Sequence, residues 1–181
     1  FTEQALTIKD ARAQALGGNV KLSGASNAQG ALQLNMSGQA EMQEVGERYG
    51  LPFKQRLRGK VPYQASLNTG KAQYTLSIQS LLQGLSVDLP APLAKSSWDS
   101  KPLRLRISGT GNEPSLLEFA YDRSLQGQLS LASKLHGQIL LGEGSIPAMP
   151  KAGLNISGSL PELNVQSWLD LSDELISDQA S

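Results

Sequence analysis

Residues 70–95 read GKAQYTLSIQSLLQGLSVDLPAPLAK, and this stretch decides the kind of fold that the chain can adopt. Tyr74, Leu76 and Ile78 alternate with the polar residues between them, which is the period of a β-strand with one buried face. The stretch contains no nucleophile, general base or metal ligand. It therefore predicts an architecture and no chemistry.

A proline-rich corner closes the same stretch. A second short apolar run, residues 85–89, ends at Leu89, Pro90 and Pro92. Proline has no backbone N–H to donate to a sheet ladder and its φ angle is fixed, so it is confined to edges, bulges and turns. Leu89, Pro90 and Pro92 are therefore expected to form a rigid structural corner with no catalytic role.

The alternation of apolar and polar residues recurs along almost the whole chain. Three segments, 34–38, 105–109 and 154–158, share the form Leu-x-(Met/Ile)-Ser-Gly, an amphipathic strand end followed by a glycine that lets the backbone turn. Outside the opening stretch, the alternating apolar positions considered for the lining of a sheet face are Leu32, Leu34, Met36, Leu103, Leu105, Ile107, Leu154 and Ile156. The pattern predicts about eleven strands, joined mostly by short turns into one long antiparallel sheet.

Two segments depart from the strand period. Residues 41–49 and 164–177 carry apolar residues at helical spacing, and Asn164 can cap the second helix. The apolar positions are Met42, Val45 and Tyr49 in the first segment and Trp168, Leu171 and Leu175 in the second. The fold class predicted from these patterns is thus mainly β, an elongated antiparallel sheet with two short helices.

The composition excludes several classes of function. The 181 residues have a formal net charge of zero, which predicts no nucleic-acid binding. The chain has no cysteine, so it has neither disulfides nor thiol chemistry. It starts at Phe1 without a methionine and contains no apolar run of membrane-spanning length, so we expect residues 1–181 to be a single β-rich segment of a longer protein.

The polar residues give weak signals for chemistry. His136 is the only histidine; it can be a lone general base, but a residue at an exposed strand end is the better interpretation. An acidic group on the C-terminal helix (Asp170, Asp173, Glu174 and Asp178) is better read as a solvated helix face than as a cation site. Two basic strand faces, Arg56/Arg58/Lys60 and Arg104/Arg106, invite a phosphate-binding interpretation, although alternation alone predicts such a solvent-facing surface.

Three blocks of the sequence resemble the AsmA-like superfamily. They are ARAQALGG (residues 11–18), the proline corner with its lead-in (residues 80–95) and a long C-terminal block (residues 135–168), and they stand in the family's order. The proline corner is the most specific of the three. The resemblance implies a curled β-sheet with an apolar interior that belongs to a periplasmic protein anchored in the inner membrane, with the anchor outside this chain.

The resemblance also implies a function, which is a non-enzymatic conduit that moves phospholipid between the inner and outer membranes. Phospholipid acyl chains, the rest of the same long chain and other envelope proteins would be its partners, and no cofactor is expected. The groove lining would consist of Leu32, Leu34, Met36, Tyr74, Leu76, Ile78, Leu103, Leu105, Ile107, Leu154 and Ile156. Two other functions remain open, namely a structural or interaction module with a closed core, and a hydrolase that uses His136.

Overall fold

The structure is a computed structural model that describes residues 6–179 apart from residues 52, 112, 114, 133 and 135, with side chains as far as residue 173. Its helices are α1 (Met42–Arg48), the 3-10 turn η1 (Lys54–Arg56) and α2 (Val165–Gln179). Its strands are β1 (Thr7–Ala15), β2 (Gly18–Ser26), β3 (Leu32–Glu41), β4 (Leu57–Arg58), β5 (Lys60–Thr69), β6 (Gln73–Ser80), β7 (Ser86–Val87), β8 (Leu103–Thr110), β9 (Leu116–Tyr121), β10 (Leu125–Ser130), β11 (His136–Leu141) and β12 (Leu154–Gly158).

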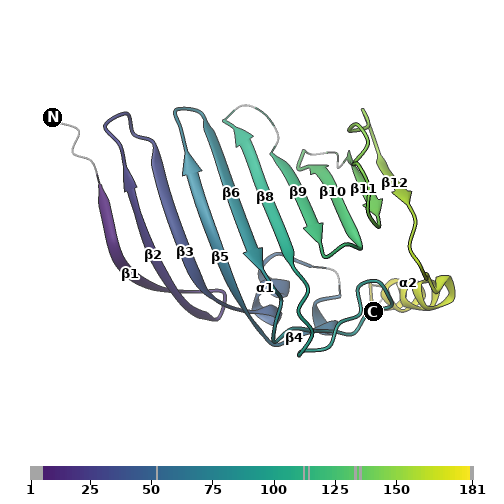
Figure 1. The fold of residues 1–181 in the computed structure, drawn as a ribbon. Helices are drawn as coiled ribbons and strands as arrows, with labels where there is room; N and C mark the ends of the chain where they lie inside the picture. Colours follow the sequence, from purple (N-terminus) through teal and green to yellow (C-terminus); the bar gives the residue numbers. More distant parts are fainter. Residues whose placement is uncertain are drawn as a thin grey trace.

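Ten of these strands form one curled sheet that does not close on itself (Figure 1). The order is β1-β2-β3-β5-β6-β8-β9-β10-β11-β12, so each strand of this sheet pairs with the one that follows it along the chain. Each pair is antiparallel from β1 to β11, as short turns between strands require. The predicted fold class, mainly β with an elongated sheet and two helices, is confirmed.

The last pair of the sheet differs from the predicted antiparallel pattern. β12 runs parallel to β11, with Ile139 opposite Ile156. Residues 142–153 connect the two strands, and a connection of that length can carry the chain back to the end where β11 began, which a parallel pair requires. On the way it passes the sheet at β10, where the Gln126 side-chain amide donates to the Gly144 carbonyl at 3.1 Å.

A small second sheet covers one end of the large one. β4 pairs with β7, and these strands lie with α1 at the end of the sheet seen at the bottom of Figure 1. The buried residues beneath them are Val61, Leu82, Leu85 and Tyr121, and the partly buried Met42, Leu57, Val87, Leu93, Leu103 and Leu125 pack around this core cluster.

The predicted shared face of Arg56, Arg58 and Lys60 is wrong. The three residues lie in three different elements, η1, β4 and β5. Gly59 breaks the strand between them with a φ angle of +115°, and a Cβ at this position would lie 2.0 Å from the Gly84 carbonyl oxygen. The close approach of the two backbones therefore needs glycine, and at this point the chain passes from the small sheet (β4) into the large one (β5).

The proline corner forms a tight turn beside this second sheet. Val87 and Lys95 exchange backbone hydrogen bonds of 2.8 and 3.1 Å, so the segment between them doubles back. Inside the turn, the Leu93 N–H donates to the Pro90 carbonyl at 3.0 Å, and the peptide bond before Pro92 is cis. The corner thus closes a side loop and does not lie in the large sheet.

The C-terminal helix α2 docks against this corner. Asn164 caps it by accepting a hydrogen bond from the Ser167 N–H at 3.1 Å, as the sequence predicts. The Trp168 indole N–H donates to the Ala91 carbonyl at 2.9 Å, and Leu171 is buried. Leu175, the third predicted contact, has its side chain outside the described part of the structure.

Candidate functional site: the apolar face of the sheet

The register of the strands brings apolar side chains into two rows that cross the whole sheet. Residues directly opposite each other on neighbouring strands point to the same face, so the pairings can be followed from strand to strand. The first row, here the Met36 row, is Ala11, Leu22, Met36, Ala65, Ile78, Leu105, Phe119, Gly127, Ile139 and Ile156. The second row, here the Leu34 row, is Ile8, Gly24, Leu34, Leu67, Leu76, Ile107, Leu117, Leu129, Gly137 and Leu154.

All eleven residues proposed from the sequence as a groove lining lie on this face. Eight of them belong to the two rows. The other three, Leu32, Tyr74 and Leu103, stand two positions before a row residue on the same strand, and side chains two apart in a strand share a face. The structure therefore brings the eleven residues together on one side of the sheet, which we call the apolar face.

The sequence patterns missed part of this face. Leu117 and Phe119 lie within the run LLEFAY, in which apolar residues occupy both the odd and the even positions of the strand. Alternation therefore does not show which of them point to the apolar face. Ala65 is small and stands between polar neighbours, and only its pairing with Met36 and Ile78 reveals its place. The missing signal was strand register, which requires partners from distant parts of the chain.

The apolar face is covered at one end and uncovered along the rest of the rows among the described residues. At the covered end, Val61 and Tyr121 are 3% and 8% exposed beneath the second sheet. Farther along the strands Ala65 and two row glycines are buried between their neighbours, but the leucine, isoleucine, methionine and phenylalanine side chains of the rows are only partly buried, and at the edge strand β12 Leu154 and Ile156 are 49% and 56% exposed. Apolar side chains are thus packed mainly by their lateral neighbours, as on an open sheet surface.

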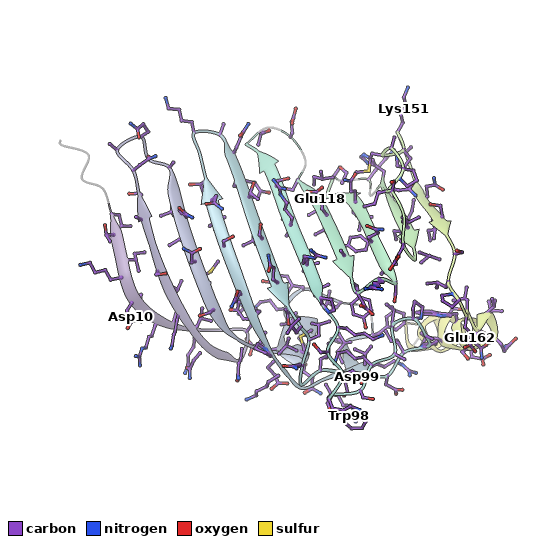
Figure 2. All side chains as sticks on the ribbon, in the orientation of Figure 1. Asp10, Trp98, Asp99, Glu118, Lys151 and Glu162 are labelled. Atoms are coloured by element: carbon purple, nitrogen blue, oxygen red, sulfur yellow. The ribbon has the colours of Figure 1, made fainter. Side chains whose placement is uncertain are left out.

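The opposite face is polar. In β3, Gln33, Asn35 and Ser37 are exposed while the apolar residues between them are partly buried. Glu118, labelled in Figure 2, lies on this face between Arg106 and Gln128, with a 3.7 Å ion pair to the first and a 3.3 Å hydrogen bond from the second. The sheet is therefore amphipathic over its whole width.

Among the side chains that the structure describes, those considered for catalysis or ion binding are not assembled into a site. The Nδ1 atom of His136 lies 3.4 Å from the Lys134 carbonyl oxygen, a backbone group and not a carboxylate. Across the described residues, no group of three or more histidine, aspartate or glutamate side chains is placed to hold a metal ion. Glu174 and Asp178 have side chains outside the described part.

Two titratable groups are buried at the covered end. Burial lowers the pKa of Lys95, whose ammonium group donates to the carbonyls of Leu85 and Ser96, both at 2.9 Å. Burial also raises the pKa of Tyr121 to about 12, with smaller contributions from Asp122 and Asp99. The Lys95 ammonium group fastens the loop of residues 81–101 over the core cluster through these two hydrogen bonds, and Tyr121 packs in that cluster.

Fold and face together define an open β-sheet protein whose principal feature is one long apolar surface. The family model described as YhdP protein matches residues 1–181, and the chain belongs to this family of AsmA-like envelope proteins. No curated protein and no solved structure gives a match. Among the described residues, no helix is long and apolar enough to cross a membrane.

Proposed function

We propose that this chain is a segment of a non-enzymatic lipid conduit in the periplasm, along which phospholipid moves between the inner and outer membranes. The observation that carries the proposal is the continuity of the Met36 and Leu34 rows. They run across the strands from β1 to β12 without a charged residue. A lipid on this face would therefore meet apolar side chains at each step across the sheet.

The uncovered state of the rows supports binding of a ligand on them. A large apolar surface that the protein itself leaves uncovered usually marks an interaction site. Burying acyl chains on such a surface contributes about 0.8 kcal/mol per methylene group. The aliphatic side chains of these rows offer a smooth surface that suits acyl chains and has no polar group to select one position along the sheet.

The unclosed shape of the sheet supports movement along it. Transport requires that the ligand enter and leave at the ends of the rows, and a sheet that does not close has an edge at β1 and another at β12. A closed sandwich core, the alternative considered from the sequence, needs a second layer over the rows. Within the described part of the chain, the second sheet supplies such a layer over the core cluster at one end and not over the rest of the rows.

The test is a charge placed on the apolar face, with a matched charge on the other face. Ile107→Asp puts a carboxylate in the Leu34 row, whereas Ser108→Asp puts the same charge on the neighbouring residue, which faces the polar side. Native mass spectrometry of the purified proteins measures the phospholipid bound to each. We expect Ile107→Asp to lose bound phospholipid, and Ser108→Asp to retain as much as the wild type.

Stability separates the proposed function from the closed-core alternative. On an uncovered surface the aspartate stays hydrated, so Ile107→Asp should cost no more than about 1–2 kcal/mol of lost lateral packing. In a closed core an unpaired carboxylate costs several kcal/mol and would unfold the domain. A folded Ile107→Asp variant that still carries phospholipid, or an unfolded one, contradicts the proposal.

A further inference from the structure

A third row of side chains borders the apolar face at the uncovered end of the strands. It lies two residues beyond the Leu34 row along each strand or its extension, so its side chains point to the same face. Its members are Ser26, Leu32, Thr69, Tyr74, Gly109, Ser115 and Leu131. Four of the seven carry a hydroxyl group, whereas no residue of the Met36 row or the Leu34 row does. We call this border the hydroxyl row.

The hydroxyl groups of this row keep hydrogen-bond donors that a ligand can use. The side-chain oxygens of Ser26 and Thr69 accept hydrogen bonds from backbone N–H groups at 2.9 and 3.2 Å. Tyr74 and Ser115 hydrogen-bond to each other beside Gly109, where a Cβ would lie 3.0 Å from the Tyr74 ring. Each hydroxyl group also has one hydrogen to donate. Among the described residues, Ser26, Thr69 and one member of the Tyr74–Ser115 pair therefore keep an O–H hydrogen without an acceptor.

The turns at the same end of the sheet carry mainly positive charge. Lys71 lies in the turn between β5 and β6, and Lys134 lies in the connection between β10 and β11. Lys151, in the connection that leads to β12, stands at the top of the view in Figure 2. Glu113, between β8 and β9, is the one acidic residue that the structure describes in these turns. The end of the sheet beyond the hydroxyl row thus has a net positive charge, which suits an anionic group.

The polarity of this face changes along its strands from one end to the other. Leu103 and Tyr121, opposite each other on β8 and β9, belong to the core cluster at the covered end. Between them and the hydroxyl row lie the Met36 row and the Leu34 row. Three steps of two residues at about 3.4 Å per residue span about 20 Å. The acyl layer of one bilayer leaflet is about 15 Å deep, so an acyl chain that lies along the strands fits in this space.

These features favour one orientation of a phospholipid over the others. A lipid with its headgroup toward the covered end would bring a phosphate against the buried core cluster, where a charged group loses its water. A lipid that lies across the strands would place its phosphate over the Met36 row or the Leu34 row, which offer no hydrogen-bond donor. At the hydroxyl row the phosphate oxygens meet O–H donors, with the lysines of the turns close by.

We propose that the hydroxyl row and the lysines of the adjoining turns hold the phosphate-bearing headgroup of a phospholipid, so that its acyl chains lie along the strands and point to the covered end. This inference rests on the proposed function and adds the orientation of the lipid and the residues that set it. Thr69, Tyr74 and Ser115, at the centre of the row, are positioning residues for the headgroup. A lipid that moves across the sheet would pass its headgroup from strand to strand along the row.

Two photoreactive phospholipids test the orientation on the purified chain. Both are phosphatidylglycerols, one with a diazirine on the headgroup and the other with a diazirine at the end of an acyl chain. After irradiation, peptide mass spectrometry locates the adducts. We expect the headgroup probe to label the hydroxyl row and its turns, and the acyl probe to label the Met36 row and Leu103.

The distribution of adducts separates this inference from the proposed function. Adducts of both probes spread alike over the apolar face, or in the reverse order, would overturn the orientation and leave the proposed function standing. Adducts of neither probe on the apolar face would overturn both.

Substitutions test the residues assigned to the headgroup. Thr69→Val/Tyr74→Phe/Ser115→Ala removes three hydroxyl groups and leaves side chains of similar size. Titrations with phosphatidylglycerol, and with a diacylglycerol that has the same acyl chains but no phosphate, measure binding. The triple variant should bind phosphatidylglycerol about tenfold more weakly, the loss of one hydrogen bond to a charged group, and should bind the diacylglycerol like the wild type.

A matched control removes a hydroxyl group from the other face. Thr75 is the neighbour of Tyr74 in β6 and points to the polar face, where it lies opposite Asn68 and Ser108. Thr75→Val should bind both lipids like the wild type. Unchanged binding of phosphatidylglycerol by the triple variant, an equal loss for both lipids, or the same loss in Thr75→Val would overturn the assignment of the hydroxyl row.

Discussion

Replacing Tyr121 by phenylalanine should stabilise the protein, because the hydroxyl group of this tyrosine is buried without a partner. Tyr121 is 8% exposed in the core cluster, and its hydroxyl oxygen hydrogen-bonds to no described residue. A buried hydroxyl that has lost its water without gaining a partner costs about 1–3 kcal/mol. Tyr121→Phe removes that cost and keeps the ring, over which the Lys101 ammonium group lies 5.5 Å from the centroid.

The pKa of the same group gives the substitution a second, pH-dependent signature. Burial raises the pKa of Tyr121 from 10.0 to about 12, so the folded protein holds this proton more tightly than the unfolded chain. The resulting stabilisation is complete below pH 10 and is lost as the pH rises through 12. A difference of about two pKa units corresponds to roughly 2–3 kcal/mol. Tyr121→Phe should not show this loss.

Urea unfolding of both proteins at pH 7 and between pH 10 and 12 measures both effects. At pH 7 we expect a gain of about 1–2 kcal/mol for Tyr121→Phe, which is about 2–4 °C in Tm for each kcal/mol in a chain of this size. The stability advantage of Tyr121→Phe over the wild type should increase between pH 10 and 12. Burial also raises the pKa of Tyr63, but Tyr63 is present in both proteins, so its titration cancels when their unfolding free energies are subtracted. A loss of 1 kcal/mol or more at pH 7 would mean that the hydroxyl has a partner, and the reasoning would be wrong.

Two further substitutions test how the covered end is held together. Lys95→Met leaves the carbonyls of Leu85 and Ser96 without their donor and should lower the free energy of unfolding in urea by about 1–3 kcal/mol. The loss is not larger because the substitution also removes a charge that is costly to bury. An unchanged midpoint would mean that the ammonium group makes no net contribution to stability. Trp168→Ala removes the hydrogen bond to Ala91 and should lower the free energy of unfolding by about 1–3 kcal/mol. Loss of a fully buried tryptophan costs about 3–5 kcal/mol, and this side chain is only partly buried. Hydrogen exchange within α2 should quicken in this variant, and exchange at the wild-type rate would argue against docking.

The local patterns in the sequence predict strands and helices well, because each depends on residues close together in the chain. The alternation in 74–78 and 103–107 identifies β6 and β8, and the spacing in 164–177 identifies α2 and its cap. Which face each alternating set occupies also follows from polarity. The apolar face is therefore largely readable before the structure is known.

Features that depend on distant partners were not predictable in this way. The strand breaks at Gly59, between the small sheet and the large one, where the Gly84 backbone lies against it, and nothing in residues 56–60 alone signals that contact. The parallel pairing of β12 depends on where the connection of residues 142–153 returns. The strand register likewise decides that Gln64, Gln79 and Arg104, which are far apart in the sequence, lie side by side on the polar face.

The central claim is that lipid lies on the apolar face, and site-specific photo-cross-linking tests it most directly. A photoreactive phenylalanine analogue is placed in cells at Leu34 and at Ile107, which belong to the Leu34 row, and at the polar-face positions Asn35 and Ser108 beside them. After irradiation, mass spectrometry measures phospholipid attached to each variant. The account predicts phospholipid adducts at Leu34 and Ile107 and none above background at Asn35 and Ser108. Equal labelling of the two faces, or no labelling in the Leu34 row, would contradict it.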